Sequence, residues 1–311
     1  MCVSSIATCA NDAGEGILGA FTRWGLISVS IALATAAVTG AAAAQDRPLV
    51  VAHRGGALLL PENTLPAFDR SVELGVDMLE FDVMMTKDDQ LIVTHDSSIN
   101  PAFCTAKAKS GVVAGPVRGL TLAQLRQFDC GSKTRPSYAG QKPVPGTRMP
   151  TLDALLARYK RARVEFFGEI KMPAAGDGDV DPVAFTKALE AKVRKFGLVD
   201  RFVLQSFDYR TIDAMHAINP RIRTCLLGVH RAKIDYLELA RRHHASCMVV
   251  RLQDSNAAQT RALREAGIKV FADVADDEQS WRAYIDAGVD ALFTNNPERA
   301  LKFLRASEVP K

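Results

Sequence analysis

The stretch LVVAHRGGALLLPENTLPAFDRSVELGVDMLEFDVMMTKDDQLIVTHD, residues 49–96, decides the predicted fold. An apolar run at 49–52 is followed by a helical pattern at 64–74 and a second apolar run at 78–83. The helical pattern begins with a capping threonine, Thr64, and has proline in its first turn. A strand, a helix and a strand in this order form a βαβ unit with parallel strands.

The same alternation continues to the end of the chain. Further apolar runs typical of strands occupy 164–170, 202–205, 223–227, 247–250, 269–273 and 290–294. Helical patterns between them occupy 182–196, 208–218, 234–243, 257–266 and 278–287. Continuous apolar strands alternating with helices indicate a parallel sheet covered by helices. Eight such strands fit a closed (β/α)8 barrel of the TIM type better than an open doubly wound sheet.

One further strand, 91–94, follows 78–83 too closely for a parallel crossover, so a β-hairpin is expected after the second barrel strand. A two-residue turn at Asp88 and Asp89 would place Asp82 opposite His95.

The segment at about 98–147 is rich in Gly, Pro, Lys and Ser and predicts a loop-rich insertion on the C-terminal face of the barrel. Cys104 and Cys130 both lie in it and are the candidate disulfide pair. Cys225 and Cys247 lie in apolar runs and are expected as buried thiols. No cysteine pair has the CxxC spacing of a thiolate zinc site.

Residues 1–44 have the pattern of a secretory signal peptide: Arg23 precedes an apolar core at 24–38, and Ala42 and Ala44 suit a cleavage site. The alternative is an uncleaved anchor, but this core is shorter than the roughly 20 residues that a spanning helix needs. We therefore expect an exported protein, periplasmic or secreted, whose residues 45–311 form one barrel domain.

The composition, with 48% hydrophobic and 24% charged residues, is that of an ordinary globular protein. Its net charge of +4 comes from lysines and arginines spread along the chain. A nucleic-acid partner, which usually requires a concentrated basic stripe, is therefore not favoured. Nothing in the composition predicts the oligomeric state.

Polar clusters recur at the predicted carboxyl ends of the strands, where barrel enzymes hold their active sites. They are His53-Arg54-Gly55-Gly56, Glu80-Phe81-Asp82, His95-Asp96, Glu169-Ile170-Lys171 and Gln205-Ser206-Phe207. Each cluster alone is more typical of a structural ion pair or a turn. Five clusters at one level of a barrel favour a functional site.

The residue types in these clusters indicate phosphate chemistry. Three carboxylates, Glu80, Asp82 and Glu169, without thiol ligands suit one hard divalent cation, Ca²⁺ or Mg²⁺. Arg54 and Lys171 would bind an anion beside it.

Two histidines, His53 and His95, flank the predicted phosphate centre and are candidates for general base and general acid. Together with the cation they predict a metal-dependent phosphodiesterase.

The motifs resemble those of the glycerophosphodiester phosphodiesterases over essentially the whole chain after residue 44. The matching segments are His53-Arg54-Gly55-Gly56, Pro61-Glu62-Asn63-Thr64, Glu80-x-Asp82, Lys87-Asp88, His95-Asp96, Pro145-Gly146-Thr147-Arg148-x-Pro150-Thr151-Leu152, Glu169-Ile170-Lys171 and Gln205-Ser206-Phe207. The resemblance implies a barrel that hydrolyses glycerophosphodiesters to glycerol 3-phosphate and an alcohol. The resemblance also implies the roles given above: Glu80, Asp82 and Glu169 on the metal, Arg54 and Lys171 on the phosphate, and His53 and His95 as the acid–base pair. Glu62, Gln205 and Phe207 are candidate pocket residues.

Two positions depart from the family pattern. The strand in which members commonly have a tryptophan reads Phe271-Ala272-Asp273 here, with Ala272 as the departing residue. Asn295 follows Thr294 where members tend to have aspartate. These departures affect the predicted substrate pocket and not the reaction type. For Phe271, the sequence slightly favours a place in the core over a place in the pocket wall.

Two alternatives remain open on the sequence alone. A lysophospholipase D or a sphingomyelinase D-like phosphodiesterase could use the same barrel with two histidines and a metal. From another class, a non-catalytic periplasmic protein could bind glycerophosphodiesters without cleaving them.

Overall fold

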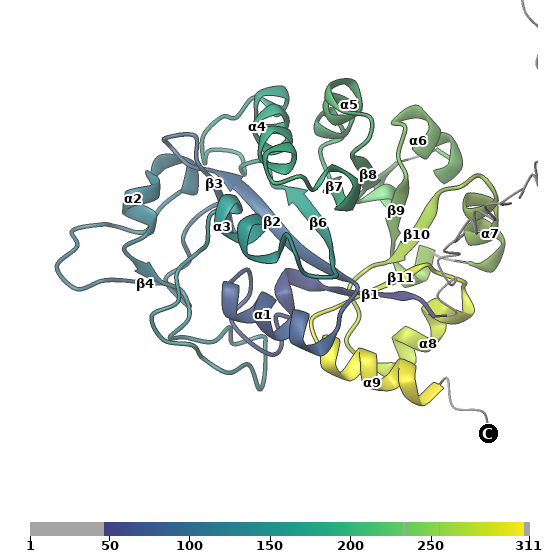
Figure 1. Ribbon diagram of the computed structural model, residues 1–311, viewed down its shortest axis with the longest axis horizontal. Coiled ribbons are helices and arrows are strands. Elements are labelled where there is room, and N and C mark those ends of the chain that lie inside the picture. Colours follow the sequence, from purple (N-terminus) through teal and green to yellow (C-terminus); the bar gives the residue numbers. More distant parts are fainter. Residues whose placement is uncertain (1–46, 233, 255, 308–311) are drawn as a thin grey trace, which may run out of the picture. The chain divides into compact units, whose positions relative to one another are not determined.

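The computed structural model describes residues 47–232, 234–254 and 256–307, so the predicted signal peptide lies outside the described residues. Nine strands form one sheet, which the pairing of β1 with β2 closes into a barrel (Figure 1). The strands are β1 (Leu49–Ala52), β2 (Met78–Met85), β3 (Leu91–Val93), β6 (Glu165–Ile170), β7 (Phe202–Ser206), β8 (Arg223–Leu226), β9 (Cys247–Val250), β10 (Lys269–Ala272) and β11 (Ala291–Thr294). All are parallel except β3, which confirms the predicted TIM-type barrel.

Helices surround the strands (Figure 1). They are α1 (Leu65–Leu74), α2 (Leu122–Leu125), α3 (Leu152–Tyr159), α4 (Pro182–Lys195), α5 (Tyr209–Ile218), α6 (Tyr236–Arg242), α7 (Ala257–Glu265), α8 (Glu278–Asp286) and α9 (Pro297–Ser307). The sequence prediction omitted α3 and α9. Side-chain caps explain most of the starts, since Thr64, Thr151, Asp181, Asp208, Asp235, Asn256 and Asp277 each accept a hydrogen bond from the first turn. In the described part of the chain, every helix is too short or too polar to span a bilayer.

Alternation along the strands builds two separate cores. Outward side chains such as Phe81 and Phe166 belong to the large core between strands and helices. Inward side chains form a smaller core inside the barrel, in which the ring of Phe167 lies 5.3 Å from that of Phe271 and 5.2 Å from that of Phe293. Phe271 is thus part of the core, as the sequence slightly favoured. This aromatic layer forms the floor beneath the polar strand ends.

The β2–β3 hairpin is present, but its predicted register is wrong by one residue. Val83 pairs with Val93, so Asp82 faces Thr94, whose N–H donates to the Asp82 carbonyl oxygen at 3.0 Å. The cause is a three-residue loop closed by Thr86 and Gln90, in which Asp89 adopts a left-handed φ of 55°. Since β3 ends at Val93, His95 lies beyond the regular ladder.

The insertion packs on the hairpin through its own small core. Met84 and Ile92 from the hairpin contact Ile99, Val117 and Phe128 from the insertion. Within it, β4 (Thr105–Ala106) pairs with β5 (Phe128–Asp129), and a disulfide joins Cys104 to Cys130, the pair that the sequence suggests. These contacts order a segment that has little regular secondary structure.

The expectation of free thiols at Cys225 and Cys247 is wrong, because a second disulfide joins them. The two residues are register partners on the neighbouring strands β8 and β9, with Cα atoms 4.5 Å apart. Both side chains point into the buried interior of the barrel. The pairing depends on strand register, which the spacing of the two cysteines along the chain does not reveal.

We predict that Gly168→Ala destabilises the fold, because a Cβ at this position in β6 would lie 2.6 Å from Phe202 Cζ. Overpacking of this kind costs about 1–3 kcal/mol. The control is Gly119→Ala, where the nearest atom would be Pro116 Cβ at 3.9 Å. Urea unfolding of both variants checks the difference, and equal stabilities would contradict the packing argument.

Candidate active site

The carboxyl ends of the strands bring the predicted polar residues together. His53 directly follows β1, Glu80 and Asp82 lie on the inner face of β2, and Glu169 lies near the end of β6. Asp82 and Glu169 are register partners on adjacent strands. The parallel arrangement therefore places side chains from distant parts of the sequence at one level of the barrel mouth.

Glu80, Asp82 and Glu169 form a compact carboxylate cluster. A carboxylate oxygen from each lies within 4.8 Å of those of the other two, and the residues are only 1%, 1% and 6% exposed. Burial, and then the charge of Asp82, raises the pKa of Glu80 well above its ordinary value and that of Glu169 to about 8. Burial also acts to raise the pKa of Asp82, but the charges of Arg54 and His95 outweigh it and lower that pKa.

This cluster fits a divalent cation. Its donor atoms are all carboxylate oxygens, the ligands that Ca²⁺ and Mg²⁺ prefer. A cation among them would offset the repulsion that raises the pKa values of Glu80 and Glu169. The arrangement could therefore hold the metal that the sequence predicts.

Neighbouring groups fix the orientation of each carboxylate. Gln205 Nε2 donates to Glu80 Oε1 at 2.8 Å, and the Arg54 N–H donates to Glu80 Oε2 at 2.7 Å. Lys171 Nζ lies 3.0 Å from Glu169 Oε1. Gln205, expected as a pocket residue, thus contacts the carboxylate cluster directly, where it can orient a ligand atom.

Asn63 is a site residue whose role the sequence reasoning missed. Its Nδ2 donates to Asp82 Oδ2 at 2.8 Å, and its Oδ1 accepts from the Asp82 N–H at 3.2 Å. The residue has a left-handed φ of 56°, which asparagine tolerates better than most side chains. Asn63 belongs to the Pro61-Glu62-Asn63-Thr64 segment of the family resemblance, but the motif alone does not indicate its contact with Asp82.

His53 is held by the last strand of the barrel. Its Nδ1 lies 2.7 Å from Asn295 Oδ1, while Asn295 Nδ2 donates to Asp276 Oδ2 at 2.8 Å. Because Asp276 accepts a hydrogen bond from the amide nitrogen of Asn295, the amide oxygen of Asn295 must face His53. Nδ1 of His53 must therefore donate the hydrogen bond to that oxygen. This leaves the Nε2 lone pair free, and burial lowers the pKa of His53 to about 3. Asp276, which the sequence analysis did not single out, therefore sets the orientation of Asn295.

His95 is held by a charged neighbour. Its Nδ1 lies 2.8 Å from Asp96 Oδ1. The hydrogen bond to His95, together with the charge of Arg135, lowers the pKa of Asp96 to about 2. The two candidate histidines thus have different environments: a neutral amide contacts the first and an ionised carboxylate contacts the second.

Two cations lie beside the carboxylates. Arg54 Nε is 3.6 Å from Asp82 Oδ2, and Lys171 Nζ is 3.9 Å from Asp82 Oδ1. Burial acts to lower the pKa of Lys171, but Glu169 and Asp82 raise it, so the side chain stays charged. These positions suit an anion bound next to a metal.

Open space adjoins Lys171 on two sides. One cavity of about 420 Å³ is lined by Glu169, Lys171 and Phe207 among others, and another of about 560 Å³ is lined by His95, Asp96 and Lys171 among others. Phe207 is 49% exposed, and Lys171 Nζ lies 5.8 Å from its ring centroid. A substrate could therefore reach both Lys171 and His95 from solvent.

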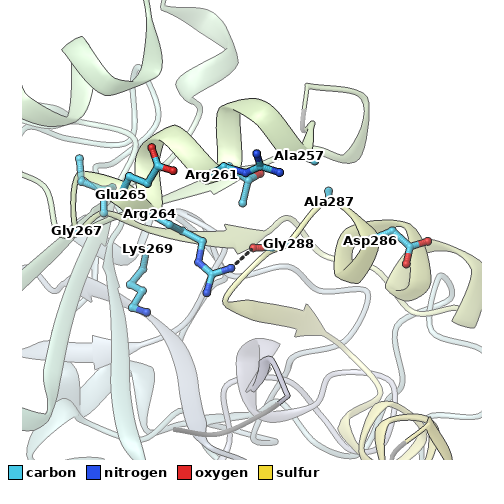
Figure 2. A pocket seen from close by; sticks show the side chains of 11 residues that line it. Ala257, Arg261, Arg264, Glu265, Gly267, Lys269, Asp286, Ala287 and Gly288 are labelled. Atoms are coloured by element: carbon cyan, nitrogen blue, oxygen red, sulfur yellow. Dashed lines mark hydrogen bonds between the residues drawn. The ribbon is translucent and has the colours of Figure 1, made fainter.

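A separate cavity of about 540 Å³ lies between α7 and α8 (Figure 2). It is lined by Arg264 and Lys269, and both lie within 3.4 Å of Asp290 Oδ1. Lys269 begins β10, so this cavity is at the amino ends of the strands, away from the carboxylate cluster. Arg264 and Lys269 are already paired with Asp290, and we assign the cavity no part in the site.

Residues 53–299 match the Glycerophosphoryl diester phosphodiesterase family. The chain is 26% identical over 285 residues to the glycerophosphodiester phosphodiesterase of Bacillus subtilis, covering 88% of this chain and 92% of that protein. It is also 25% identical to the solved glycerophosphodiester phosphodiesterase of Agrobacterium tumefaciens, with a TM-score of 0.66 over 81% of this chain and 98% of that one.

A phosphodiesterase from Oleispira antarctica, solved in complex with the product sn-glycerol-3-phosphate, shares the fold at 22% identity, with a TM-score of 0.67 over 83% of this chain and 97% of that one. The family match spans the barrel from the end of its first strand into its last helix. The chain therefore belongs to the glycerophosphodiester phosphodiesterase family.

Proposed function

We propose that the chain hydrolyses glycerophosphodiesters to glycerol 3-phosphate and an alcohol, with one divalent cation and two histidines. The observation that carries this proposal is the buried cluster of Glu80, Asp82 and Glu169. His53 follows β1 directly, and His95 follows β3 by two residues. The Oleispira antarctica phosphodiesterase, with its bound glycerol 3-phosphate, supports the choice of product.

Glu80, Asp82 and Glu169 would hold Ca²⁺ or Mg²⁺. When bound, the cation supplies positive charge that stabilises the negative charge developing on the phosphate oxygens. Arg54 and Lys171 add charge-assisted hydrogen bonds to the same phosphate. Glu62 and Phe207 remain proposed pocket residues, Glu62 through its ion pair with Arg54 and Phe207 through its exposed ring.

His53 is the proposed general base. The amide oxygen of Asn295 accepts a hydrogen bond from the Nδ1–H of His53, so the lone pair on Nε2 is free. The lowered pKa of His53 keeps the ring neutral. It takes the proton of the free glycerol hydroxyl, whose oxygen attacks phosphorus and forms a cyclic phosphate. A negatively charged phosphodiester near the ring stabilises the imidazolium that results.

His95 is the proposed general acid. Asp96 accepts a hydrogen bond from the Nδ1–H of His95, which leaves Nε2 to carry the proton that the leaving alcohol receives. Water then opens the cyclic phosphate to glycerol 3-phosphate. Direct attack by water on the diester is the competing route.

Export is also proposed. The pattern of residues 1–44 supports it, and so do the two disulfides, which persist in oxidising compartments.

Removal of the metal is expected to abolish hydrolysis of glycerophosphocholine. Treatment with EDTA should remove activity, and adding back Ca²⁺ or Mg²⁺ should restore it, because the carboxylate cluster requires a cation to offset its charge. Glycerol 3-phosphate release measures the effect, and the metal that restores more activity identifies the preferred ion. Full activity in protein verified to be metal-free would contradict the proposal.

His53→Ala and His95→Ala are each expected to lower kcat by about 10²–10⁴-fold, the usual contribution of a general acid or base. His243→Ala is the matched control, since His243 pairs with Asp213 outside the site. Circular dichroism should show an intact fold in all three variants. Unchanged turnover in either site variant would rule out its proposed role.

The substrate and the route are tested by product analysis. Glycerophosphocholine is expected to be cleaved faster than lysophosphatidylcholine, with a transient cyclic glycerophosphate under single-turnover conditions. Faster cleavage of the lysophospholipid would favour the lysophospholipase D alternative. Absence of the cyclic species would favour direct attack by water, and binding without cleavage of either compound would indicate a non-catalytic protein.

A further inference from the structure

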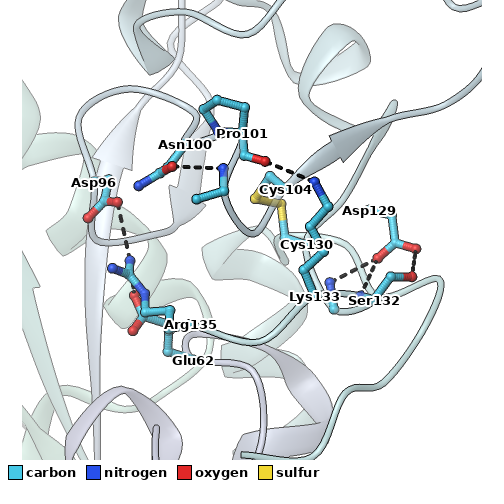
Figure 3. Close-up of a disulfide and its surroundings, with 12 residues drawn as sticks. Glu62, Asp96, Asn100, Pro101, Cys104, Asp129, Cys130, Ser132, Lys133 and Arg135 are labelled. Atoms are coloured by element: carbon cyan, nitrogen blue, oxygen red, sulfur yellow. Dashed lines mark hydrogen bonds and ion pairs between the residues drawn. A yellow bond between two sulfur atoms is a disulfide. The ribbon is translucent and has the colours of Figure 1, made fainter. Parts of the chain in front are cut away.

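Arg135 belongs to the insertion, yet its side chain reaches the active site. Its NH2 group lies 2.7 Å from Glu62 Oε1 and 3.2 Å from Asp96 Oδ2. Figure 3 shows the side chain of Arg135 between these two carboxylates. We propose that Arg135 is a positioning residue that holds His95 through Asp96 and keeps Arg54 available through Glu62. The proposal rests on the roles assigned above to His95 and Arg54.

On the His95 side, Asp96 uses its two oxygens for two different partners. Oδ1 faces His95 Nδ1 at 2.8 Å, and Oδ2 faces the guanidinium of Arg135 at 3.2 Å. The side chain of Asp96 is 28% exposed, so without Arg135 it could rotate toward solvent. The second contact therefore fixes the rotamer that orients the imidazole of His95.

On the Arg54 side, Glu62 lies between two arginines. Its Oε1 is 3.1 Å from Arg54 NH1 and 2.7 Å from Arg135 NH2, and its side chain is 7% exposed. One carboxylate between two guanidinium groups leaves a net positive charge. Arg135 thus offsets Glu62, so that the charge of Arg54 remains available for a phosphate.

The position of Arg135 is itself built by the insertion. Its guanidinium lies 4.0 Å from the ring centroid of Phe103, which precedes the disulfide-bonded Cys104. Its backbone N–H donates to Gln141 Oε1 at 3.0 Å, and Gln141 Nε2 donates to the carbonyl oxygen of Ala57 at 2.6 Å. The loop that carries Arg135 is therefore tied to the segment that follows Arg54.

Arg118 provides a matched comparison within the insertion. Its NH1 lies 2.6 Å from Asp89 Oδ1, and the side chain also donates to the carbonyl oxygen of Thr86. These partners belong to the turn of the β2–β3 hairpin. Among the described residues, Arg118 makes no hydrogen bond or ion pair with a histidine or with the carboxylate cluster. Loss of insertion packing alone should affect both arginine variants alike.

The test compares Arg135→Ala, Arg135→Lys and Arg118→Ala in hydrolysis of glycerophosphocholine with the activating metal. We expect Arg135→Ala to lower kcat by about 10–100-fold, the usual cost of losing an orienting outer contact, with KM changed far less. Arg135→Lys should recover part of the loss because it keeps the charge, and Arg118→Ala should retain kcat. Wild-type kcat in Arg135→Ala, or an equal fall in Arg118→Ala, would overturn the inference.

A second measurement does not depend on turnover. In ¹⁵N-histidine-labelled protein without metal, the Nδ1 proton of His95, assigned by its loss in His95→Gln, should give an NMR signal that Arg135→Ala broadens or removes. A signal unchanged in Arg135→Ala would also overturn the inference. Failure of the proposed function can be distinguished from failure of the Arg135 inference, because the wild-type protein would then release no glycerol 3-phosphate.

Discussion

The burial of three carboxylates at one level of a closed barrel is the constraint on which the rest of the site depends. Glu80, Asp82 and Glu169 repel one another where water cannot screen them. Isolated buried charges are expensive, so the surrounding residues must supply opposite charge or hydrogen bonds. Arg54 and Lys171 provide the charge, and the amides of Asn63 and Gln205 provide the hydrogen bonds.

The barrel supports this arrangement from below. Phe167, Phe271 and Phe293 fill the interior beneath the carboxylates and exclude water from that side. These rings pack against one another and belong to a different apolar cluster from the one between the strands and the helices. Access is thus confined to the carboxyl ends of the strands, where the cavities next to Lys171 open.

The two histidines acquire different chemistry from their partners. Burial, and then the charge of Arg54, lowers the pKa of His53 and favours the neutral ring, although the hydrogen bond to Asn295 acts to raise that pKa. His95 lies against Asp96, whose carboxylate is kept ionised by the hydrogen bond to His95 and by the charge of Arg135. Asn295, which departs from the family pattern, fixes the tautomer of His53, because its amide oxygen accepts a hydrogen bond from Nδ1.

The sequence by itself determined the fold class, the positions of the strands and the residues that meet at the barrel mouth. It could do so because apolar periodicity and polar strand ends are local signals, and parallel strands place those ends together. The predictions from the sequence were wrong where the outcome depends on how neighbouring strands are aligned. The hairpin register followed from the left-handed conformation of Asp89, and the Cys225–Cys247 disulfide followed from the alignment of β8 with β9.

Only the tertiary structure decided the surroundings of the two histidines. Asn295 and Asp276 reach His53 because barrel closure places β11 beside β1, although 242 positions separate His53 from Asn295. Arg135 reaches Asp96 because the insertion folds back over the hairpin around a disulfide and a small apolar core. Such contacts carry no periodic or motif signal, since they join segments whose proximity arises only when the chain closes on itself.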